Sequence, residues 1–218
     1  MTSSGKKFIS VVGNIGVGKT TFAEFLAQQF HWPVYYESVI DNPYLPKYYE
    51  DMTRWSFHLQ IYFFVKRFKD QLQIKNSSNS GVTDRSIFED PKVFARMLNK
   101  LGHLSDLDFK TYLDLFEHFE PFIISPDLYI YLKASTWTLK SRIDNRGREF
   151  EKSITPEFLH QLNISYEVWI RELTQTHNLI IIDTDKFNIE KDIEKRNHFL
   201  EIIRERLHHP VIGSPIIE

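Results

Sequence analysis

The residues with the most specific chemistry lie in the segment VGNIGVGKTT, residues 12–21. Gly13, Gly18, Lys19 and Thr20 fill the fixed positions of the phosphate-binding pattern G-x-x-x-x-G-K-[ST], and the apolar run before them is typical of a short buried strand. The glycines let the backbone turn tightly, so that its amide groups point at a phosphate oxygen, and the helix that begins next adds its positive end. The segment therefore predicts a phosphate-binding loop between a strand and a helix.

The residue types within this loop predict separate tasks. The Lys19 ammonium group supplies a point charge to the outer phosphates, and the Thr20 hydroxyl is a ligand for Mg²⁺. The loop alone does not identify the acceptor of the phosphate, because switches, motors and small-molecule kinases all carry it. The residues expected to contact the phosphates are Gly13, Asn14, Ile15, Gly16, Val17, Gly18, Lys19, Thr20 and Thr21.

Charged residues stand at the ends of three further short apolar segments. They are Glu37, the pair Asp84 and Arg85, and Asp183. In a parallel sheet, ligands gather beyond the carboxyl ends of the strands, so we expect these side chains to converge on the loop. Glu37 could then orient an attacking hydroxyl and accept its proton, whereas a lone carboxylate at a strand end is more often a solvated cap. Asp84 could hold a Mg²⁺-bound water and Arg85 could bind the attacking oxygen or the transferred phosphoryl group, although the pair could also be a surface ion pair.

Two pairs of residues on helices could read a ligand. Gln60 and Arg67 are seven residues apart on an aromatic helix predicted over 53–74, so they project from the same face and need a partner there. Asp90 and Phe94 share a face of the next predicted helix, although Asp90 could instead cap that helix.

Three arginines surround a glycine at Arg142, Arg146 and Arg148. Such a charge run is often a solvated helix end. In a phosphotransferase the arginines can instead close over the donor phosphates, neutralise charge that develops during transfer and exclude water. We favour this second interpretation, a lid with Gly147 as a possible hinge.

The elements that must position these residues alternate between strand and helix. Residues 41–49 read as a turn-rich segment, Val82-Thr83 is too short to assign from periodicity, and the tail 209–218 is expected to be partly ordered at most. The pattern predicts an α/β protein with a parallel sheet wrapped on both faces. The predicted strands are 8–12, 34–36, 127–132 and 179–182, and the predicted helices are 21–30, 53–74, 90–101, 108–119, one through Leu139, 156–173 and 189–207.

Composition narrows the class of protein. The chain has 218 residues, of which 42% are hydrophobic, and this favours a single domain over residues 1–218. A formal charge of -2 gives no long-range field for a nucleic acid polymer or an anionic membrane, so neither is expected as a partner. There is no cysteine, and no apolar stretch approaches the roughly 20 residues of a membrane span. We expect a soluble cytoplasmic protein.

Taken together, the motifs resemble those of the deoxynucleoside kinases. The resemblance spans about residues 8–185 and is closest to the bacterial deoxyadenosine/deoxyguanosine kinase branch. It implies a P-loop kinase fold with a central five-stranded parallel sheet, an arginine-rich lid and commonly a homodimer packed through helices. It also implies ATP-dependent phosphorylation of a deoxynucleoside 5′-hydroxyl. The motifs are GNIGVGKTT, YYES with Glu37, RWSFHLQ with Gln60 and Arg67 seven later, DRSIFED over 84–90, and R-x-x-x-R-G-R-x-x-E ending at Glu151.

The resemblance also implies roles for individual residues. Glu37 matches the general base and Arg85 the arginine beside the 5′-hydroxyl. The remaining matches are Tyr49 and Glu151 for the sugar 3′-hydroxyl, Gln60, Arg67 and Asp90 for reading the base, Phe94 for stacking on it, and Arg142, Arg146 and Arg148 for the lid. Many relatives have Glu-Arg-Ser where this chain has Asp84-Arg85-Ser86, and the shorter carboxylate favours a water-mediated contact to Mg²⁺.

The amide of Gln60 offers one donor and one acceptor, which suits N1 and N6 of adenine or N3 and N4 of cytosine. We therefore expect a purine preference with deoxyadenosine first, and deoxyguanosine or deoxycytidine as secondary substrates. A nucleoside monophosphate kinase of the thymidylate kinase type shares the loop and lid, but Glu37 would repel the phosphate of its acceptor. A GTP-dependent switch or a non-enzymatic nucleotide-binding module is disfavoured because no N-K-x-D sequence is present and no predicted strand ends in D-x-x-G.

Overall fold

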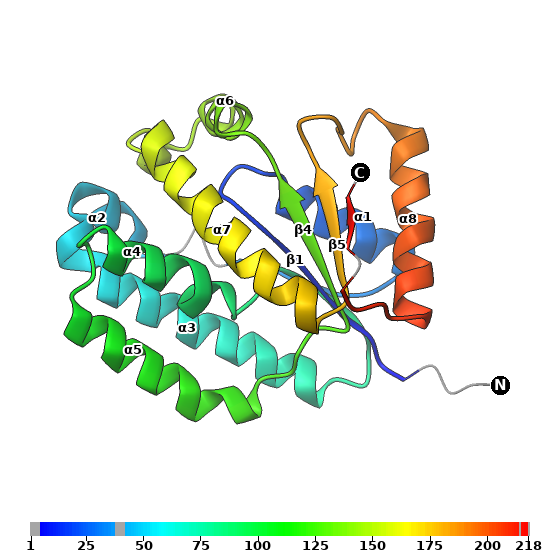
Figure 1. The fold of residues 1–218 in the computed structure, drawn as a ribbon, viewed down its shortest axis with the longest axis horizontal. Helices are drawn as coiled ribbons and strands as arrows, with labels where there is room; N and C mark the ends of the chain where they lie inside the picture. The colour runs from blue at the N-terminus through cyan, green and yellow to red at the C-terminus, as the bar shows by residue number, and fades with distance from the viewer. Residues whose placement is uncertain (1–4, 38–41, 214, 218) are drawn as a thin grey trace.

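A six-stranded parallel sheet forms the centre of the computed structural model, which describes residues 5–37, 42–213 and 215–217 (Figure 1). The strand order is β2-β3-β1-β4-β5-β6. The strands are β1 (Phe8–Gly13), β2 (Val34–Tyr35), β3 (Gly81–Asp84), β4 (Leu128–Lys133), β5 (Leu179–Asp183) and β6 (Ile216–Ile217). The four strands assigned from the sequence are confirmed, and β3 forms at the segment that was too short to assign.

Helices cover both faces of this sheet. In Figure 1, α7 crosses the near face, α1 lies behind the strands, and α3 and α5 pack side by side. None of the helices among the described residues has the combination of length and apolar character needed to cross a membrane. The longer helices are α1 (Lys19–Phe30), α3 (Met52–Asn76), α5 (Asp106–Phe119), α6 (Thr136–Arg146), α7 (Pro156–Thr176) and α8 (Ile193–His208).

Local sequence explains why these elements form. Every residue of β1 is buried, as expected for a central parallel strand with helices on both faces. The side chains of Asp51, Ser105, Ser135 and Thr155 each accept a hydrogen bond from a backbone N–H in the first turn of α3, α5, α6 and α7, respectively. These caps fix where the helices start, and thereby which way their inner faces point.

Three segments differ from the sequence prediction. The turn-rich segment contains a short helix, α2 (Leu45–Glu50), because Pro46 fits the first turn of a helix and Asn42 Oδ1 accepts hydrogen bonds from the backbone N–H groups of Tyr44 and Leu45. The predicted helix 90–101 begins as a π-helix, η1 (Asp90–Ala95), and continues as α4 (Arg96–Lys100). The tail adds β6 to the sheet edge beside β5 and a bridge between Ile212 and Asn178.

Candidate active site

The loop after β1 adopts a conformation that requires glycine. Gly13, Gly16 and Gly18 have φ of 144°, 81° and 103°, which L-residues with a Cβ rarely adopt. A Cβ on Gly13 would lie 2.4 Å from the carbonyl oxygen of Leu132, so β4 also leaves no space there. The loop therefore has the tight turn that the sequence predicts.

Two side chains of the loop hold it in place. Asn14 Nδ2 donates to Leu159 O on α7 at 2.9 Å and to Asn163 Oδ1 at 2.7 Å, while its Oδ1 accepts from the backbone N–H of Ile15. Lys19 Nζ donates to the carbonyl oxygen of Asn14 at 2.9 Å and is only 6% exposed. Burial, followed by the nearby Arg85 charge, lowers the pKa of Lys19 to about 8. The Asn14 side chain thus anchors the loop to α7, and the Lys19 ammonium group is bound to the loop backbone.

The loop opens into a cavity of about 510 Å³ that brings together most of the predicted site residues. It is lined by residues from the loop, from the ends of β2 and β3, from α2 and α3, and from the arginine-rich segment. The predicted residues that line it are Ile15, Gly16, Gly18, Lys19, Thr20, Thr21, Glu37, Tyr49, Gln60, Arg67, Asp84, Arg85, Asp90, Phe94, Arg142, Arg146, Arg148 and Glu151.

Four predicted residues do not line this cavity. Gly13 and Asn14 belong to the loop but line neither this cavity nor a second one of about 220 Å³, which Val17 lines. Asp183 lies at the end of β5, where its Oδ1 accepts from the backbone N–H of Asp185 at 3.0 Å, and it lines neither cavity.

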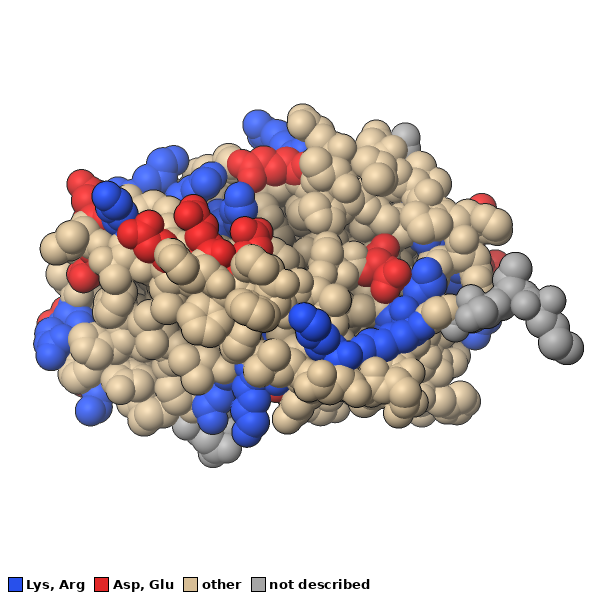
Figure 2. All heavy atoms as spheres, turned by 90° about the horizontal axis from the view of Figure 1, so that it is seen from below, with Lys and Arg blue, Asp and Glu red and all other residues tan. Residues whose placement is uncertain are grey.

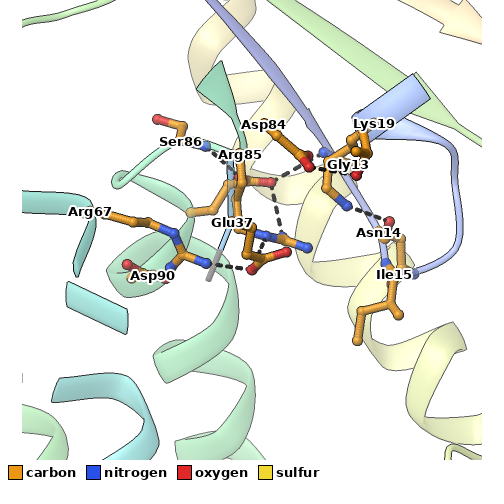
Figure 3. Close-up of polar contacts among 12 residues, drawn as sticks. Gly13, Asn14, Ile15, Lys19, Glu37, Arg67, Asp84, Arg85, Ser86 and Asp90 are labelled. Atoms are coloured by element: carbon orange, nitrogen blue, oxygen red, sulfur yellow. Dashed lines mark hydrogen bonds and ion pairs between the residues drawn. The ribbon is translucent and has the colours of Figure 1, made fainter. Parts of the chain in front are cut away.

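Glu37 lies between two buried arginines (Figure 3). Its Oε1 is 2.6 Å from Arg67 Nη2 and 2.7 Å from Arg85 Nε. Burial alone would raise the pKa of Glu37, but the Arg85 and Arg67 charges outweigh it and lower the pKa to about 2. The carboxylate is therefore ionised and held by two arginines.

Arg67 also contacts Asp90, and this pair closes the far end of the cavity. Arg67 Nη1 donates to Asp90 Oδ1, and burial raises the pKa of Asp90 to about 6 against the opposing effect of Arg67. Gln60 Oε1, Asp90 Oδ2 and Arg67 Nε are buried without a hydrogen-bond partner among the described residues. Since buried polar groups are normally satisfied, these atoms point to a polar ligand.

Thr20 and Asp84 adjoin at the loop end of the cavity. Thr20 Oγ1 donates to Asp84 Oδ2 at 2.5 Å, while Asp84 Oδ1 is buried without a partner among the described residues. Burial raises the pKa of Asp84. A hydroxyl and a carboxylate with a free oxygen form the type of donor set that Mg²⁺ prefers, so these residues fit the predicted metal.

The arginines of the arginine-rich segment form ion pairs and hydrogen bonds that the sequence did not predict. Arg146 Nη2 and Arg148 Nη1 lie 2.6 and 3.5 Å from Oε1 of the buried Glu151. Arg142 donates to the carbonyl oxygen of Val17 at 3.1 Å and to the backbone and side chain of Thr184. Gly147 ends α6 at φ 68°, which is a helix C-cap.

Tyr49 lies beside Glu151, as its predicted shared role requires. Burial, followed by the Glu151 charge, raises the pKa of Tyr49, so its hydroxyl stays protonated and can donate a hydrogen bond. Phe94 also lines the cavity and packs against Arg85, whose guanidinium carbon is 4.8 Å from the Phe94 ring centroid.

Sequence reasoning missed Glu89 and Tyr166. Glu89 is fully buried and accepts hydrogen bonds from Gly13 N, Ser86 N and Tyr166 Oη at 3.1, 2.7 and 2.6 Å. The one available signal was that Glu89 follows Arg85 at the i, i+4 spacing. Tyr166 gave no signal, because a tyrosine on an apolar helix face is ordinarily part of the core.

Comparison with known proteins decides the family to which this site belongs. The family model described as deoxynucleoside kinase matches residues 9–208. The chain belongs to the deoxynucleoside kinase family. This deoxynucleoside kinase is 41% identical over 190 residues to the deoxyadenosine/deoxycytidine kinase of Bacillus subtilis (strain 168), with 85% of this chain and 88% of that protein covered.

Two further relatives agree with this assignment. The kinase is 36% identical over 169 residues to a deoxyguanosine kinase of the same organism, with 77% of this chain and 80% of that protein covered. A deoxyadenosine kinase from M. mycoides, solved with products dCMP and dCDP bound, matches with a TM-score of 0.80 and 31% sequence identity. That match covers 89% of this chain and 99% of the other.

Family membership confirms several predictions from the sequence. The chain is an enzyme with the P-loop kinase fold, and it phosphorylates deoxynucleosides. The resemblance to the bacterial deoxyadenosine/deoxyguanosine kinases is confirmed, and the thymidylate kinase alternative is not supported. The tasks of the individual residues in this deoxynucleoside kinase remain predictions.

Proposed function

We propose that this enzyme transfers the γ-phosphoryl group of ATP to the 5′-hydroxyl of a deoxynucleoside, with deoxyadenosine as its preferred substrate. The observation that carries the proposal is a cavity with the phosphate loop at one end and, at the other, polar atoms of Gln60 and Asp90 for which the described part of the chain supplies no hydrogen-bond partner. Glu37 and Arg85 lie between these ends, where the acceptor hydroxyl would meet the phosphate.

Glu37 and Arg85 supply the groups that the transfer needs. Glu37 orients the hydroxyl and accepts its proton, and Arg85 stabilises charge on the transferred phosphoryl group and the attacking oxygen. Tyr49 and Glu151 hold the sugar 3′-hydroxyl, and Phe94 stacks on the base. Their positions in one cavity support these tasks.

The donor nucleotide is proposed to extend behind the loop. Gly18, Thr21 and Arg142 line both cavities, so the second cavity continues from the phosphate loop. Its walls include Phe22 and Phe187, which suit the flat adenine ring of ATP. The phosphates then occupy the loop and the base occupies the second cavity.

Mg²⁺ is the proposed cofactor, held by Thr20 directly and by Asp84 through water. Asp84 Oδ1, which no described residue bonds, lies beside the Thr20 hydroxyl and supports this assignment. When bound, the cation neutralises charge on the donor phosphates. Asp84 keeps the Thr20 hydroxyl oriented, and Lys19 holds the phosphate side of the loop.

The lid is proposed to act by an exchange of partners. Arg146 and Arg148 are paired with Glu151, which also adjoins Tyr49. A 3′-hydroxyl that bonds to Glu151 would compete with these arginines and leave them available for the donor phosphates. Arg142 already links the loop to the segment after β5 and needs no such movement.

The expected base preference follows from the buried polar atoms to which no described residue bonds. Gln60 Oε1 and Asp90 Oδ2 are acceptors, and they match the exocyclic amino group of adenine or cytosine. Guanine and thymine present a carbonyl oxygen at the corresponding position, which would oppose these acceptors unless Gln60 turns its amide. We expect deoxyadenosine first, deoxycytidine or deoxyguanosine next, and thymidine last.

Steady-state kinetics on the four deoxynucleosides test this order. We expect kcat/KM for deoxyadenosine to exceed that for thymidine by about 10- to 100-fold, because an acceptor opposed to a carbonyl costs about 1–3 kcal/mol. Purine 2′-deoxyriboside, which lacks only the 6-amino group, is the matched control and should lose a similar factor. Thymidine emerging as the best substrate would contradict the proposed recognition.

A homodimer is also proposed, with α7 in its interface. Ile164 and Val168 lie one turn apart on α7, and each is 41% exposed. Analytical ultracentrifugation should give twice the mass of one chain, and Ile164→Glu should reduce it to one. Val65→Glu on α3 is the control, because that residue is exposed on another helix. A monomeric wild-type chain would refute the dimer, and an unchanged mass for Ile164→Glu would refute this interface.

A further inference from the structure

Glu89 is a buried carboxylate that does not line the substrate cavity but contacts Arg85, which does. It stands just before η1 and is 0% exposed. Its Oε1 accepts from the Gly13 backbone N–H at 3.1 Å, and its Oε2 accepts from the Ser86 backbone N–H at 2.7 Å. One side chain therefore ties the start of the phosphate loop to the turn that carries Arg85.

That turn is strained. Arg85 adopts φ 93°, in the left-handed region that residues with a Cβ rarely occupy, and such a conformation persists only where the surroundings hold it. The Glu89 bond to Ser86 N holds the next residue of the turn. With this backbone conformation the Arg85 side chain points towards Glu37 in the cavity (Figure 3).

The Arg85 guanidinium group is fixed on several sides. Its Nη1 donates to Tyr166 Oη at 2.8 Å and lies 3.4 Å from Glu89 Oε1. Tyr166 in turn donates to Glu89 at 2.6 Å, so the hydrogen bonds run in one direction from arginine through tyrosine to carboxylate. Phe94 covers the guanidinium face at 4.8 Å, and Nε faces Glu37 at 2.7 Å.

We propose that Glu89 is a positioning residue for phosphoryl transfer. Together with Tyr166, it holds Arg85 at a set place between Glu37 and the transferred phosphoryl group, and through Gly13 it fixes that place relative to the donor loop. This inference rests on the proposed function of Arg85. Transfer requires the attacking oxygen and the phosphorus at near-attack separation, and a misplacement of about 1 Å costs about 10²-fold in rate.

A role confined to stability predicts different kinetics. A buried carboxylate with these partners also stabilises the fold, and its loss would reduce the folded fraction without changing turnover per folded molecule. A positioning role lowers kcat and leaves the KM for the deoxynucleoside nearly unchanged, because the contacts proposed for the base edge and the 3′-hydroxyl come from other residues that line the cavity, such as Gln60 and Tyr49. The split between kcat and KM therefore separates the two roles.

Tyr166→Phe and Glu89→Gln are the test variants. Tyr166→Phe removes only the relay hydroxyl, and we expect kcat to fall about 10-fold. Glu89→Gln replaces one of the accepting oxygens by an NH₂ donor, which then opposes a backbone N–H or the tyrosine hydroxyl, and we expect kcat to fall about 10²-fold. The KM for deoxyadenosine should stay within about 3-fold of wild type in both variants. Thermal unfolding of each variant gives the folded fraction.

Tyr131→Phe is the matched control. Tyr131 is equally buried and stacks on Tyr166 at 5.8 Å, but its hydroxyl bonds to Glu167 and not to Arg85. We expect it to lose stability without losing kcat. If Glu89→Gln does not fold, Tyr166→Phe decides the matter, because a kcat within 2-fold of wild type for this variant would overturn the proposal.

A double-mutant cycle asks whether Glu89 acts through Arg85. In an Arg85→Ala background, Tyr166→Phe or Glu89→Gln should change kcat by less than 2-fold, whereas independent effects would multiply. Multiplicative effects would overturn the proposal. The proposed function fails separately, since wild-type enzyme without deoxynucleoside kinase activity would refute that function before any variant is compared.

Discussion

Replacing Glu37 by glutamine is expected to lower kcat by about 10² to 10⁴ and to leave deoxyadenosine affinity within about threefold. Glutamine keeps the shape of the side chain and can still accept hydrogen bonds from Arg67 and Arg85, but it cannot take up the proton of the 5′-hydroxyl. Steady-state kinetics at saturating ATP give kcat, and calorimetric titration with deoxyadenosine gives the affinity. The two measurements separate chemistry from binding.

The environment of Glu37 shapes what this result would mean. With a pKa of about 2, the Glu37 carboxylate is a weak base at pH 7, whereas efficient general bases have a pKa near the working pH. Glu37 can contribute to catalysis in two ways. A bound nucleoside can draw Arg67 away and so raise the pKa of Glu37, or the carboxylate can mainly orient the attacking hydroxyl. The second way is compatible with a loose transition state in which the proton leaves late.

The same pKa shift gives a dependence on pH with a definite sign. A folded-state pKa below the ordinary 4.5 means that ionised Glu37 stabilises the fold above pH 4.5, and that this stabilisation is lost as the pH falls towards 2. The difference in unfolding free energy between wild type and Glu37→Gln should therefore shrink over that range. Chemical denaturation at pH 7, 4.5 and 3 measures it.

Glu50→Gln is the control for both measurements. Glu50 is the last residue of α2 and follows Tyr49, which lines the cavity, but the Glu50 side chain is exposed. It should retain the kcat and the acid stability profile of wild type. A near-normal kcat for Glu37→Gln would exclude Glu37 as the base, whatever its position in the cavity.

The part of this site that the sequence predicted is the part set by rules local to the chain. The glycine pattern of the loop requires a particular backbone, and the structure has it at Gly13 and Gly18. Glu37, Asp84 and Arg85 were expected to converge because carboxyl ends of parallel strands share one edge, and they line one cavity. Strand order was not needed for that inference.

The part that was missed depends on contacts between distant segments. Glu89 bonds to Gly13, 76 residues away, and to Tyr166, 77 residues away, and no periodicity encodes such pairs. The pairing of Arg146 with Glu151 was hidden for another reason, because the sequence shows how many charges a segment carries but not which of them is buried. Asp183 lies at the end of β5 as predicted, but its carboxylate accepts a hydrogen bond from the backbone N–H of Asp185. A position at a strand end therefore does not by itself bring a side chain into the site.

Replacing Lys19 by alanine is expected to lower kcat/KM for ATP by about 10² to 10⁴, because the loop would lose the charge that binds the outer phosphates and follows the phosphoryl group during transfer. Lys19→Met, which keeps the length of the side chain, should lose a similar factor. Kinetics with varied ATP at saturating deoxyadenosine measure it. Lys110→Ala, an exposed lysine on α5, is the control and should match wild type.

The lowered pKa of Lys19 adds a signature that simple loss of folding cannot imitate. Burial lowers its pKa to about 8, so part of the population is neutral at pH 8.5 before ATP binds. Phosphate oxygens favour the charged form and raise the pKa again, so ATP binding at pH 8.5 should take up protons. Calorimetry in two buffers of different ionisation enthalpy detects this uptake, which should be absent in Lys19→Met. Proton uptake that persists in that variant would mean that another group titrates with the donor, and the charge on the loop would then need a different source.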